Sequence, residues 1–233
     1  MSEALPLVLI PGLLASARLF APQIPMLWRL GPLTVADHTR DDSMDAIARR
    51  ILASAPPRFA LAGLSMGGYI CFEILRQEPG RVARLALLDT SARADTPEAT
   101  AMRRTQMALA AEGRLGEVVE TQFERMVHPL HRNDTRLRDL NRLMGEDVGP
   151  EAFVRQQTAI IGRPDSLPTL AAIGCPTLVL VGEQDELTPP ARAAEIADGI
   201  PGAQLMTVPE CAHLSTIERP REVTRALVDW LRG

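Results

Sequence analysis

Short runs of hydrophobic residues alternate with longer amphipathic stretches along most of the chain. Several runs are apolar at every position, which is typical of strands that are covered on both faces of a sheet. Helical periodicity follows three of them, over residues 43–54, 66–77 and 220–231. This alternation predicts βαβ units and a mainly parallel sheet of about six strands, in an α/β fold with three αβα layers. The predicted strands are residues 7–10, 33–36, 58–62, 85–89, 177–181 and 203–208.

Residues 93–168 break this alternation, because they show helical periodicity without a convincing strand. Glycine and proline residues divide the interval, which predicts about four short helices between the fourth and fifth strands. We therefore expect an α/β core formed by residues 1–92 and 169–233, with residues 93–168 inserted in it. Ligands of open parallel sheets bind at the carboxyl ends of the strands. We expect the insertion to be a cap over a site there, and a purely structural elaboration is the alternative.

A G-x-S-x-G motif joins the third predicted strand to the following helix. Its serine is Ser65, flanked by Gly63 and Gly67. A serine on a sharp turn between strand and helix exposes its hydroxyl above the sheet, and side chains at the two glycine positions would collide across that turn. The helix N-terminus also favours negative charge beside the serine. The motif predicts that Ser65 is a nucleophile.

A serine hydroxyl needs a base to accept its proton, and histidine is the usual base. His213 follows the last predicted strand, so it lies at the same sheet edge as Ser65, and we predict that it is the base. The other three histidines, His38, His128 and His131, are interpreted as structural or exposed. His128 and His131 have no acidic or cysteine ligand at metal spacing, so no metal site is predicted.

The oxyanion formed by acyl transfer requires backbone N–H donors. One is predicted at Met66, directly after the nucleophile, and the second in the loop after the first strand, where Gly12 allows close approach. Leu13 is the predicted second donor and Leu14 is the alternative. An acidic residue should orient the histidine. The candidates are three carboxylates after the fifth strand, Glu183, Asp185 and Glu186, and one at the end of the fourth strand, Asp89.

Composition narrows the range of partners. The 233 residues are 46% hydrophobic, which is enough for a large core, and the net charge of −4 argues against nucleic acid and anionic membranes. Aromatic residues make up only 3%, so a pocket would be lined by aliphatic and methionine side chains. The chain contains no lysine, which excludes Schiff-base chemistry and a P-loop.

The three cysteines show no metal-ligand spacing, and an odd number suits a reducing compartment. The first apolar run is too short for a signal sequence or a membrane span. We therefore expect a cytoplasmic protein that acts on a small molecule. The sequence predicts no oligomeric state.

Together these motifs resemble the α/β-hydrolase superfamily over nearly the whole chain. The matching segments are Leu-Ile-Pro-Gly-Leu-Leu, Gly-Leu-Ser-Met-Gly-Gly, Cys-Pro-Thr-Leu-Val-Leu-Val-Gly-Glu-Gln-Asp and Ala-His-Leu-Ser-Thr-Ile-Glu-Arg-Pro. The chain is similar to small capped members such as carboxylesterases, enol-lactonases, carbon–carbon bond hydrolases and menaquinone-pathway lyases. The resemblance implies no cofactor. It selects Asp185 as the acid, because its offset from the strand end resembles the family pattern, with Asp89 as the alternative.

The chain departs from the family pattern at three points. The usual His-Gly before the oxyanion loop is Pro11-Gly12, which removes a side-chain contact, and the residue before the histidine is Ala212 instead of glycine. Only a few residues precede the first strand, so we expect the family's N-terminal antiparallel hairpin to be missing. Family members that are dehalogenases or epoxide hydrolases carry aspartate at the elbow, and Ser65 argues against both activities.

The resemblance implies a serine hydrolase that cleaves a small ester, thioester or lactone through an acyl–Ser65 intermediate. One alternative is a carbon–carbon bond hydrolase or lyase with the same triad, acting on a carboxylate that Arg125, Arg155 or Arg163 would bind. Another is a non-catalytic binding protein on the same fold. Four methionines of the insertion are candidates for an adaptable acyl pocket or for core packing: Met102, Met107, Met126 and Met144.

Overall fold

A single sheet forms the centre of the molecule. The structure is a computed structural model that describes residues 4–233. Six strands pair in the order β2-β1-β3-β4-β5-β6, and every pair is parallel. The predicted parallel sheet is confirmed. Residues 4–6 precede β1 without forming a strand, and the first three residues lie outside the described part. The strands are β1 (Leu7–Ile10), β2 (Leu33–Val35), β3 (Phe59–Leu64), β4 (Val82–Leu88), β5 (Thr177–Gly182) and β6 (Gln204–Val208).

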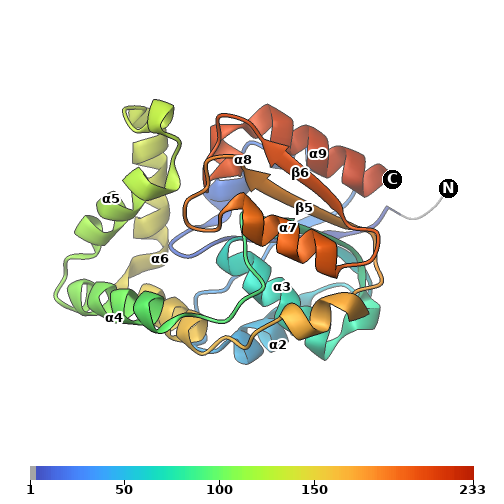
Figure 1. Cartoon of the computed structure of the whole chain (residues 1–233), viewed down its shortest axis with the longest axis horizontal. Coiled ribbons are helices and arrows are strands. Elements are labelled where there is room, and N and C mark those ends of the chain that lie inside the picture. Colours follow the sequence, from blue (N-terminus) through green and yellow to red (C-terminus); the bar gives the residue numbers. More distant parts are fainter. Residues whose placement is uncertain (1–3) are drawn as a thin grey trace.

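Helices cover both faces of the sheet (Figure 1). Successive strand residues point to opposite faces, so each face has its own apolar cluster. In β3, for example, Leu61 packs with one cluster, whereas Ala60 and Ala62 pack with the other. The first cluster includes residues of α2 (Met44–Ser54), α3 (Met66–Gln77) and α7 (Pro190–Gly199), and the second includes residues of α1 (Ile24–Leu27), α8 (Ser215–Glu218) and α9 (Pro220–Arg232).

The strand register brings several carboxyl ends to one edge of the sheet. Ile10 at the end of β1 pairs with Gly63, and Leu64 at the end of β3 pairs with Leu88 at the end of β4. Leu88 in turn pairs with Leu180 of β5. Loops that leave these strands therefore meet above the same edge, which is where parallel sheets bind ligands.

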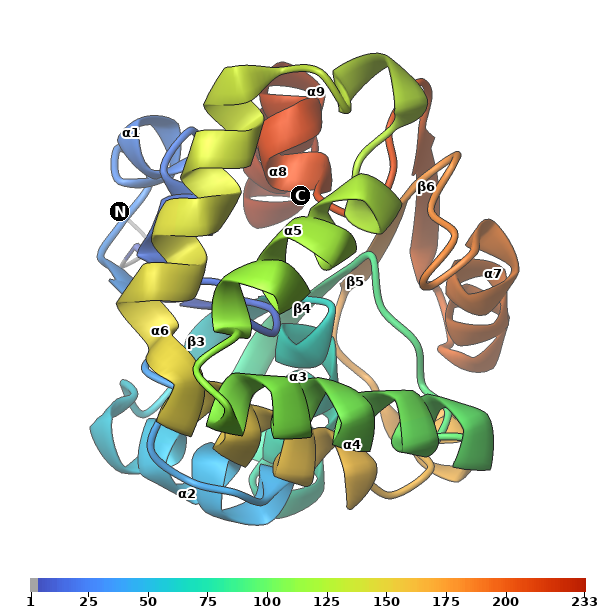
Figure 2. The same ribbon diagram turned by 90° about the vertical axis from the view of Figure 1, so that its left-hand side faces the viewer.

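The segment between β4 and β5 stands in front of this edge (Figures 1 and 2). It contains α4 (Pro97–Ala111), α5 (Leu115–Met126) and α6 (Thr135–Ile161), with short 3-10 turns at Pro129–His131 and Leu167–Ala172. The expectation of about four short helices is confirmed, because α6 consists of two helices, residues 135–148 and 150–161, that a kink at Gly149 separates. Gly149, with φ of 76°, and Pro150 bend it in the middle. Within residues 4–233, no helix is both long and apolar enough to cross a membrane.

Candidate active site

Ser65 occupies the sharp turn between β3 and α3. Its backbone has φ of 55° and ψ of −115°, a conformation that costs energy for a residue with a side chain. Hydrogen bonds hold the backbone there, because Ser65 N–H donates to Leu88 O at 2.9 Å and Ser65 O accepts from Gly68 N–H at 2.9 Å. Ser65 O also accepts from Thr90 Oγ1 at 2.7 Å. The surrounding structure therefore fixes the strained serine that the motif predicted.

The two glycines of the motif are required by close backbone contacts. A Cβ on Gly63 would overlap the backbone of Gly67, as expected from the sequence. A Cβ on Gly67 would overlap the carbonyl of Ile10, at the end of β1. The second contact links the elbow to the neighbouring strand, and it holds the loop after β1 close to Ser65.

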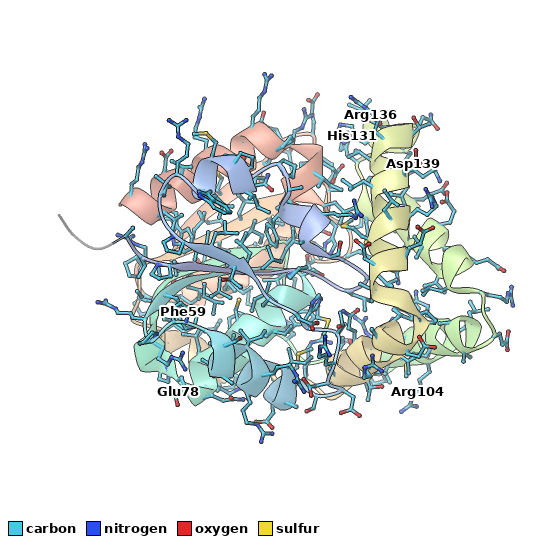
Figure 3. All side chains as sticks on the ribbon, turned by 180° about the vertical axis from the view of Figure 1, so that it is seen from behind. Phe59, Glu78, Arg104, His131, Arg136 and Asp139 are labelled. Carbon is cyan, nitrogen blue, oxygen red and sulfur yellow. The ribbon has the colours of Figure 1, made fainter. Side chains whose placement is uncertain are left out.

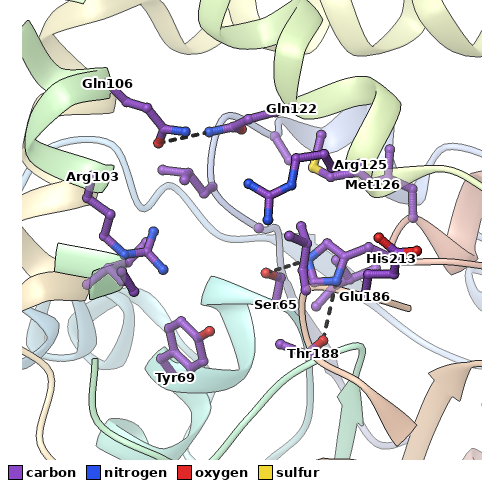
Figure 4. Close-up of a pocket in the computed structure, with 18 of the residues that line it drawn as sticks. Ser65, Tyr69, Arg103, Gln106, Gln122, Arg125, Met126, Glu186, Thr188 and His213 are labelled. Carbon is purple, nitrogen blue, oxygen red and sulfur yellow. Dashed lines mark hydrogen bonds between the residues drawn. The ribbon is translucent and has the colours of Figure 1, made fainter. Parts of the chain in front are cut away.

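The structure brings Ser65, His213 and Asp185 together as a continuous hydrogen-bonded chain. Ser65 Oγ lies 2.8 Å from His213 Nε2 (Figure 4). His213 Nδ1 lies 2.8 Å from Asp185 Oδ2. An ionised carboxylate accepts from Nδ1–H, and this leaves Nε2 free to accept the serine proton. The side chains of His213 and Asp185 are 5% and 0% exposed, so water does not compete for these contacts.

Asp185 is held as an anion despite its burial. Burial alone raises the pKa of this carboxyl, but the charge of His213 and hydrogen bonds from His213 and Thr188 lower it below its usual range. Asp185 Oδ1 accepts from the N–H groups of Leu187 and Thr188 at 2.8 and 3.0 Å, and Oδ2 accepts from Thr188 Oγ1 at 2.7 Å. In His213, burial lowers the pKa, but the Asp185 carboxylate raises it above its usual value.

The loop that carries His213 is held from two sides. From beneath, Glu218 Oε1 accepts from the N–H groups of Ala212 and Leu214 at 3.0 and 3.3 Å. From the helical segment, Met126 O at the end of α5 accepts from His213 N–H at 2.9 Å. The position of the imidazole therefore depends on both α8 and the helical segment between β4 and β5.

Asp89, the alternative acid, lies beneath the site and contacts other groups. Its Oδ1 accepts from Gly182 N–H at 2.9 Å, and its Oδ2 contacts Ser215 Oγ. Burial raises the pKa of Asp89 well above the usual range, and the charge of Asp185 raises it further. Asp185, and not Asp89, therefore contacts the imidazole of His213 as an anion.

The loop after β1 lies directly beside the elbow. A Cβ built on Gly12 would be 3.3 Å from Ser65 Cβ, so the loop lies close to Ser65. Leu14 N–H, the alternative oxyanion donor, is occupied, because it donates to Gln156 Oε1 at 3.1 Å. Within residues 4–233, no hydrogen-bond acceptor faces the N–H groups of Leu13 and Met66. Of these two residues, Leu13 lines the cavity above Ser65, and Met66 directly follows Ser65 in the elbow.

His38 contacts this loop at the point where the family pattern places a histidine and this chain has Pro11. Its ring follows β2, is 2% exposed, and lies with Nε2 at 2.9 Å from Gly12 O and 3.1 Å from Gln156 Nε2. Burial lowers the pKa of His38, so the ring is neutral. A histidine from another part of the chain therefore supports the loop where Pro11 has no side-chain hydrogen bond to offer. The sequence contains no local signal for this role of His38 or for that of Gln156.

A cavity of about 270 Å³ opens above Ser65 (Figure 4). Its floor comes from the elbow and the loops after β1 and β5, and its opposite wall comes mainly from α4 and α5. Aliphatic side chains line much of the floor, as the low aromatic content predicts. The wall combines apolar and polar side chains, namely Met102, Arg103, Gln106, Gln122, Arg125 and Met126.

Only one of the three arginines named from the sequence lines this cavity. Arg125 does, whereas Arg155 donates to Thr39 O at 2.9 Å on another side of the insertion. Arg163 pairs with Asp95 and stacks 4.3 Å from the ring centroid of Tyr69. Arg103 was missed, because nothing in its sequence context distinguishes it from the other arginines.

The four methionines of the insertion were candidates for a pocket lining or for core packing, and the structure shows both positions. Met102 and Met126 line the cavity, whereas Met107 does not and Met144 is buried in the core. Within the part of the chain that the structure describes, no three histidine, cysteine or acidic side chains gather as metal ligands.

Comparison with known proteins places the chain in a family. Residues 7–226 match the sequence model of the alpha/beta hydrolase family, so the chain belongs to it. An esterase from Thermogutta terrifontis has the same fold, with a TM-score of 0.89 and 30% identity over 99% of this chain and 90% of that one. The fold is also that of the enol-lactonase from Burkholderia xenovorans LB400, with a TM-score of 0.90 and 23% identity over 100% and 93% of the two chains.

A curated relative is the pimeloyl-[acyl-carrier protein] methyl ester esterase of Nitrosomonas europaea. It is 25% identical over 190 residues, which are 78% of this chain and 74% of the relative. The hydrolase class is therefore shared by proteins similar in sequence and by proteins similar in structure.

Proposed function

We propose that the protein is a serine hydrolase that cleaves a small ester, thioester or lactone through an acyl–Ser65 intermediate. The observation that carries this proposal is the chain of two 2.8 Å contacts from Asp185 through His213 to Ser65. Relatives described as esterases support the reaction class. Residues 93–168 are proposed as a cap that closes the cavity over the nucleophile.

The mechanism follows from the positions of these groups. Ser65 Oγ attacks the substrate carbonyl carbon while His213 Nε2 takes the serine proton. The N–H groups of Leu13 and Met66 stabilise the oxyanion, and its collapse expels the alcohol or thiol, which receives the proton from His213. Water then attacks the acyl–Ser65 ester and gives its proton to His213. The acid product leaves as the proton returns to Ser65.

The test is a panel of nitrophenyl esters, thioesters and lactones of increasing acyl length, measured with the wild type and with Ser65→Ala. We expect Ser65→Ala to lower kcat by roughly 10³- to 10⁶-fold, because the triad acts as a unit. Ser54→Ala, on the remote helix α2, is the matched control. Equal rates in wild type and Ser65→Ala would exclude the mechanism.

A carbon–carbon bond hydrolase or lyase acting on a small carboxylate is the second candidate. The observation that favours it is the presence of Arg103 and Arg125 in the cavity. It predicts that a fluorophosphonate modifies Ser65 although the whole ester panel is inert. Inertness together with no modification of Ser65 would instead indicate a binding protein.

A further inference from the structure

Two guanidinium groups point into the cavity from different helices. Figure 4 shows Arg103 of α4 and Arg125 of α5 directed toward the space above Ser65 from opposite sides. The partner of Arg125 is weak, because its Nη1 lies 3.5 Å from Met102 Sδ. Among residues 4–233, no carboxylate pairs with Arg125. A charged group that faces a cavity with only a thioether for a partner is available to an anionic ligand.

Arg103 is more firmly held than Arg125. Its Nε lies 3.2 Å from Asp95 Oδ1, and its Nη1 donates to Gln157 Oε1 at 2.8 Å. The same Asp95 carboxylate also pairs with Arg163 at 2.9 Å. One buried carboxylate is thus shared by two guanidinium groups, so it does not fully neutralise either. The wall behind the cavity therefore retains positive charge.

One carboxylate does line the cavity and opposes this charge. Glu186 follows β5, is exposed to solvent, and lies beside His213, across the cavity from Arg103 in Figure 4. Water screens an exposed carboxylate effectively. An anion bound between Arg103 and Arg125 would therefore be attracted by two guanidinium groups and repelled weakly by Glu186.

Building on the proposed function, we propose that Arg103 and Arg125 form a subsite for a carboxylate. The substrates are then short aliphatic esters that carry a second, ionised carboxylate. Arg125 can bind the carboxylate through two parallel hydrogen bonds, which fixes orientation as well as charge, and Arg103, whose Nε and Nη1 are already bonded, offers its Nη2. The apolar side chains of Met102 and Met126 are suited to contact the methylene groups that join the carboxylate to the ester.

The experiment compares monomethyl glutarate, which carries one free carboxylate at neutral pH, with dimethyl glutarate, which carries none. We expect the wild type to have the higher kcat/KM for the monomethyl ester. In Arg125→Gln the ratio of the two kcat/KM values should fall roughly 10- to 100-fold, mainly through KM, because a charge-assisted hydrogen bond is removed. Arg125 is the residue to change because its substitution breaks no ion pair.

Arg104→Gln is the matched control. Arg104 is the next residue of α4, is exposed on the outside of the molecule and does not line the cavity (Figure 3). This variant should keep the wild-type ratio. The subsite would be overturned if the wild-type kcat/KM for monomethyl glutarate did not exceed that for dimethyl glutarate. It would also be overturned if Arg125→Gln left the ratio of these two values unchanged.

A binding measurement separates this inference from the proposed function. Monomethyl glutarate is titrated by calorimetry into Ser65→Ala and into the double variant Ser65→Ala/Arg125→Gln, and the Kd should be roughly 10- to 100-fold higher in the double variant. Binding that depends on Arg125, together with no ester hydrolysis by the wild type, would remove the proposed function and keep the subsite. Ester hydrolysis through Ser65, together with equal Kd values in the two variants, would remove the subsite and keep the proposed function.

Discussion

The two walls of the cavity are built on different principles. On the sheet side, Ser65, His213 and Asp185 follow strand ends, and His213 and Asp185 are almost fully buried. On the helical side, Arg103 is half-buried and Arg125 is exposed, and both lie on helices that are separate from the hydrogen-bonded sheet. Strand ends and backbone hydrogen bonds place the residues of the first wall, whereas side-chain packing places those of the second.

Under the proposed function, the sheet wall carries out the chemistry and the helical wall selects the substrate. Groups that move protons must keep their relative positions to within a fraction of an ångström, and hydrogen-bonded strand ends provide that precision. Groups that choose between substrates tolerate looser placement and can vary without disturbing the reaction. Changes on the sheet wall should therefore lower kcat, and changes on the helical wall should mainly alter KM.

After Ser65→Ala, the largest expected effect on kcat concerns the two buried aspartates on the sheet side. Asp185→Asn should lower kcat by roughly 10²- to 10⁴-fold, because the amide cannot hold the same tautomer of His213 or stabilise its charged form. The kcat of Asp89→Asn should stay within about tenfold of the wild-type value. Burial and the charge of Asp185 raise the pKa of Asp89, so its negative charge is disfavoured, and an asparagine in its place can accept from Gly182 N–H and donate to Ser215 Oγ.

Steady-state kinetics on both variants, with thermal unfolding to confirm that each is folded, checks this pair. A greater loss in Asp89→Asn than in Asp185→Asn would assign the acid to the fourth strand.

Gln156 tests the contrast between the two walls, because it belongs to α6 but its side chain holds the loop after β1, which is part of the sheet wall. Gln156→Met removes the acceptor for Leu14 N–H at similar side-chain size. We expect kcat to fall on the order of tenfold with little change in KM, less than the 10²- to 10³-fold cost of removing an oxyanion donor itself. Gln77→Met, at the far end of α3, is the control. A change confined to KM would show that Gln156 acts on substrate binding instead.

The smallest effect is a shift in the pH profile. His213 must be neutral to accept the serine proton, so kcat/KM should fall as the pH drops through the pKa of His213. Because Asp185 raises that pKa, the midpoint should lie above the ordinary value of about 6.5. The pH profile of the residual activity of Asp185→Asn should have a lower midpoint than the wild-type profile. Arg125→Gln should change the midpoint less than Asp185→Asn does. Equal midpoints in wild type and Asp185→Asn would contradict the role given to Asp185.

Most of the fold could be predicted from the sequence because local patterns determine it. The apolar runs correspond to strands close to the observed bounds, and residues 66–77 form α3 as predicted. Helix α7 was missed, since its apolar face is short and includes Ala193 and Ile196. The division of α6 into two helices was predictable, because Gly149 and Pro150 interrupt the helical pattern and Gly149 has non-helical φ and ψ.

The residues of the sheet wall could be predicted from the sequence, whereas most of those on the helical wall could not. Ser65 and His213 stand in motifs next to strand ends, so chain order alone predicts their proximity. Arg103 and Gln156 lie on helices whose orientation depends on long-range packing, and no motif marks them. Arg163 shows the same point in reverse, because a candidate for substrate binding instead packs against the ring of Tyr69.

The central claim is that Ser65 is the nucleophile, and modification with a fluorophosphonate tests it most directly. The protein is treated with the reagent, the modified residue is identified by peptide mass spectrometry, and esterase activity is followed in parallel. We predict one adduct, on the peptide that contains Ser65, with activity lost in proportion to its formation and no adduct in Ser65→Ala. Full activity after complete modification of Ser65, or hydrolysis with Ser65 unreactive, would contradict the account.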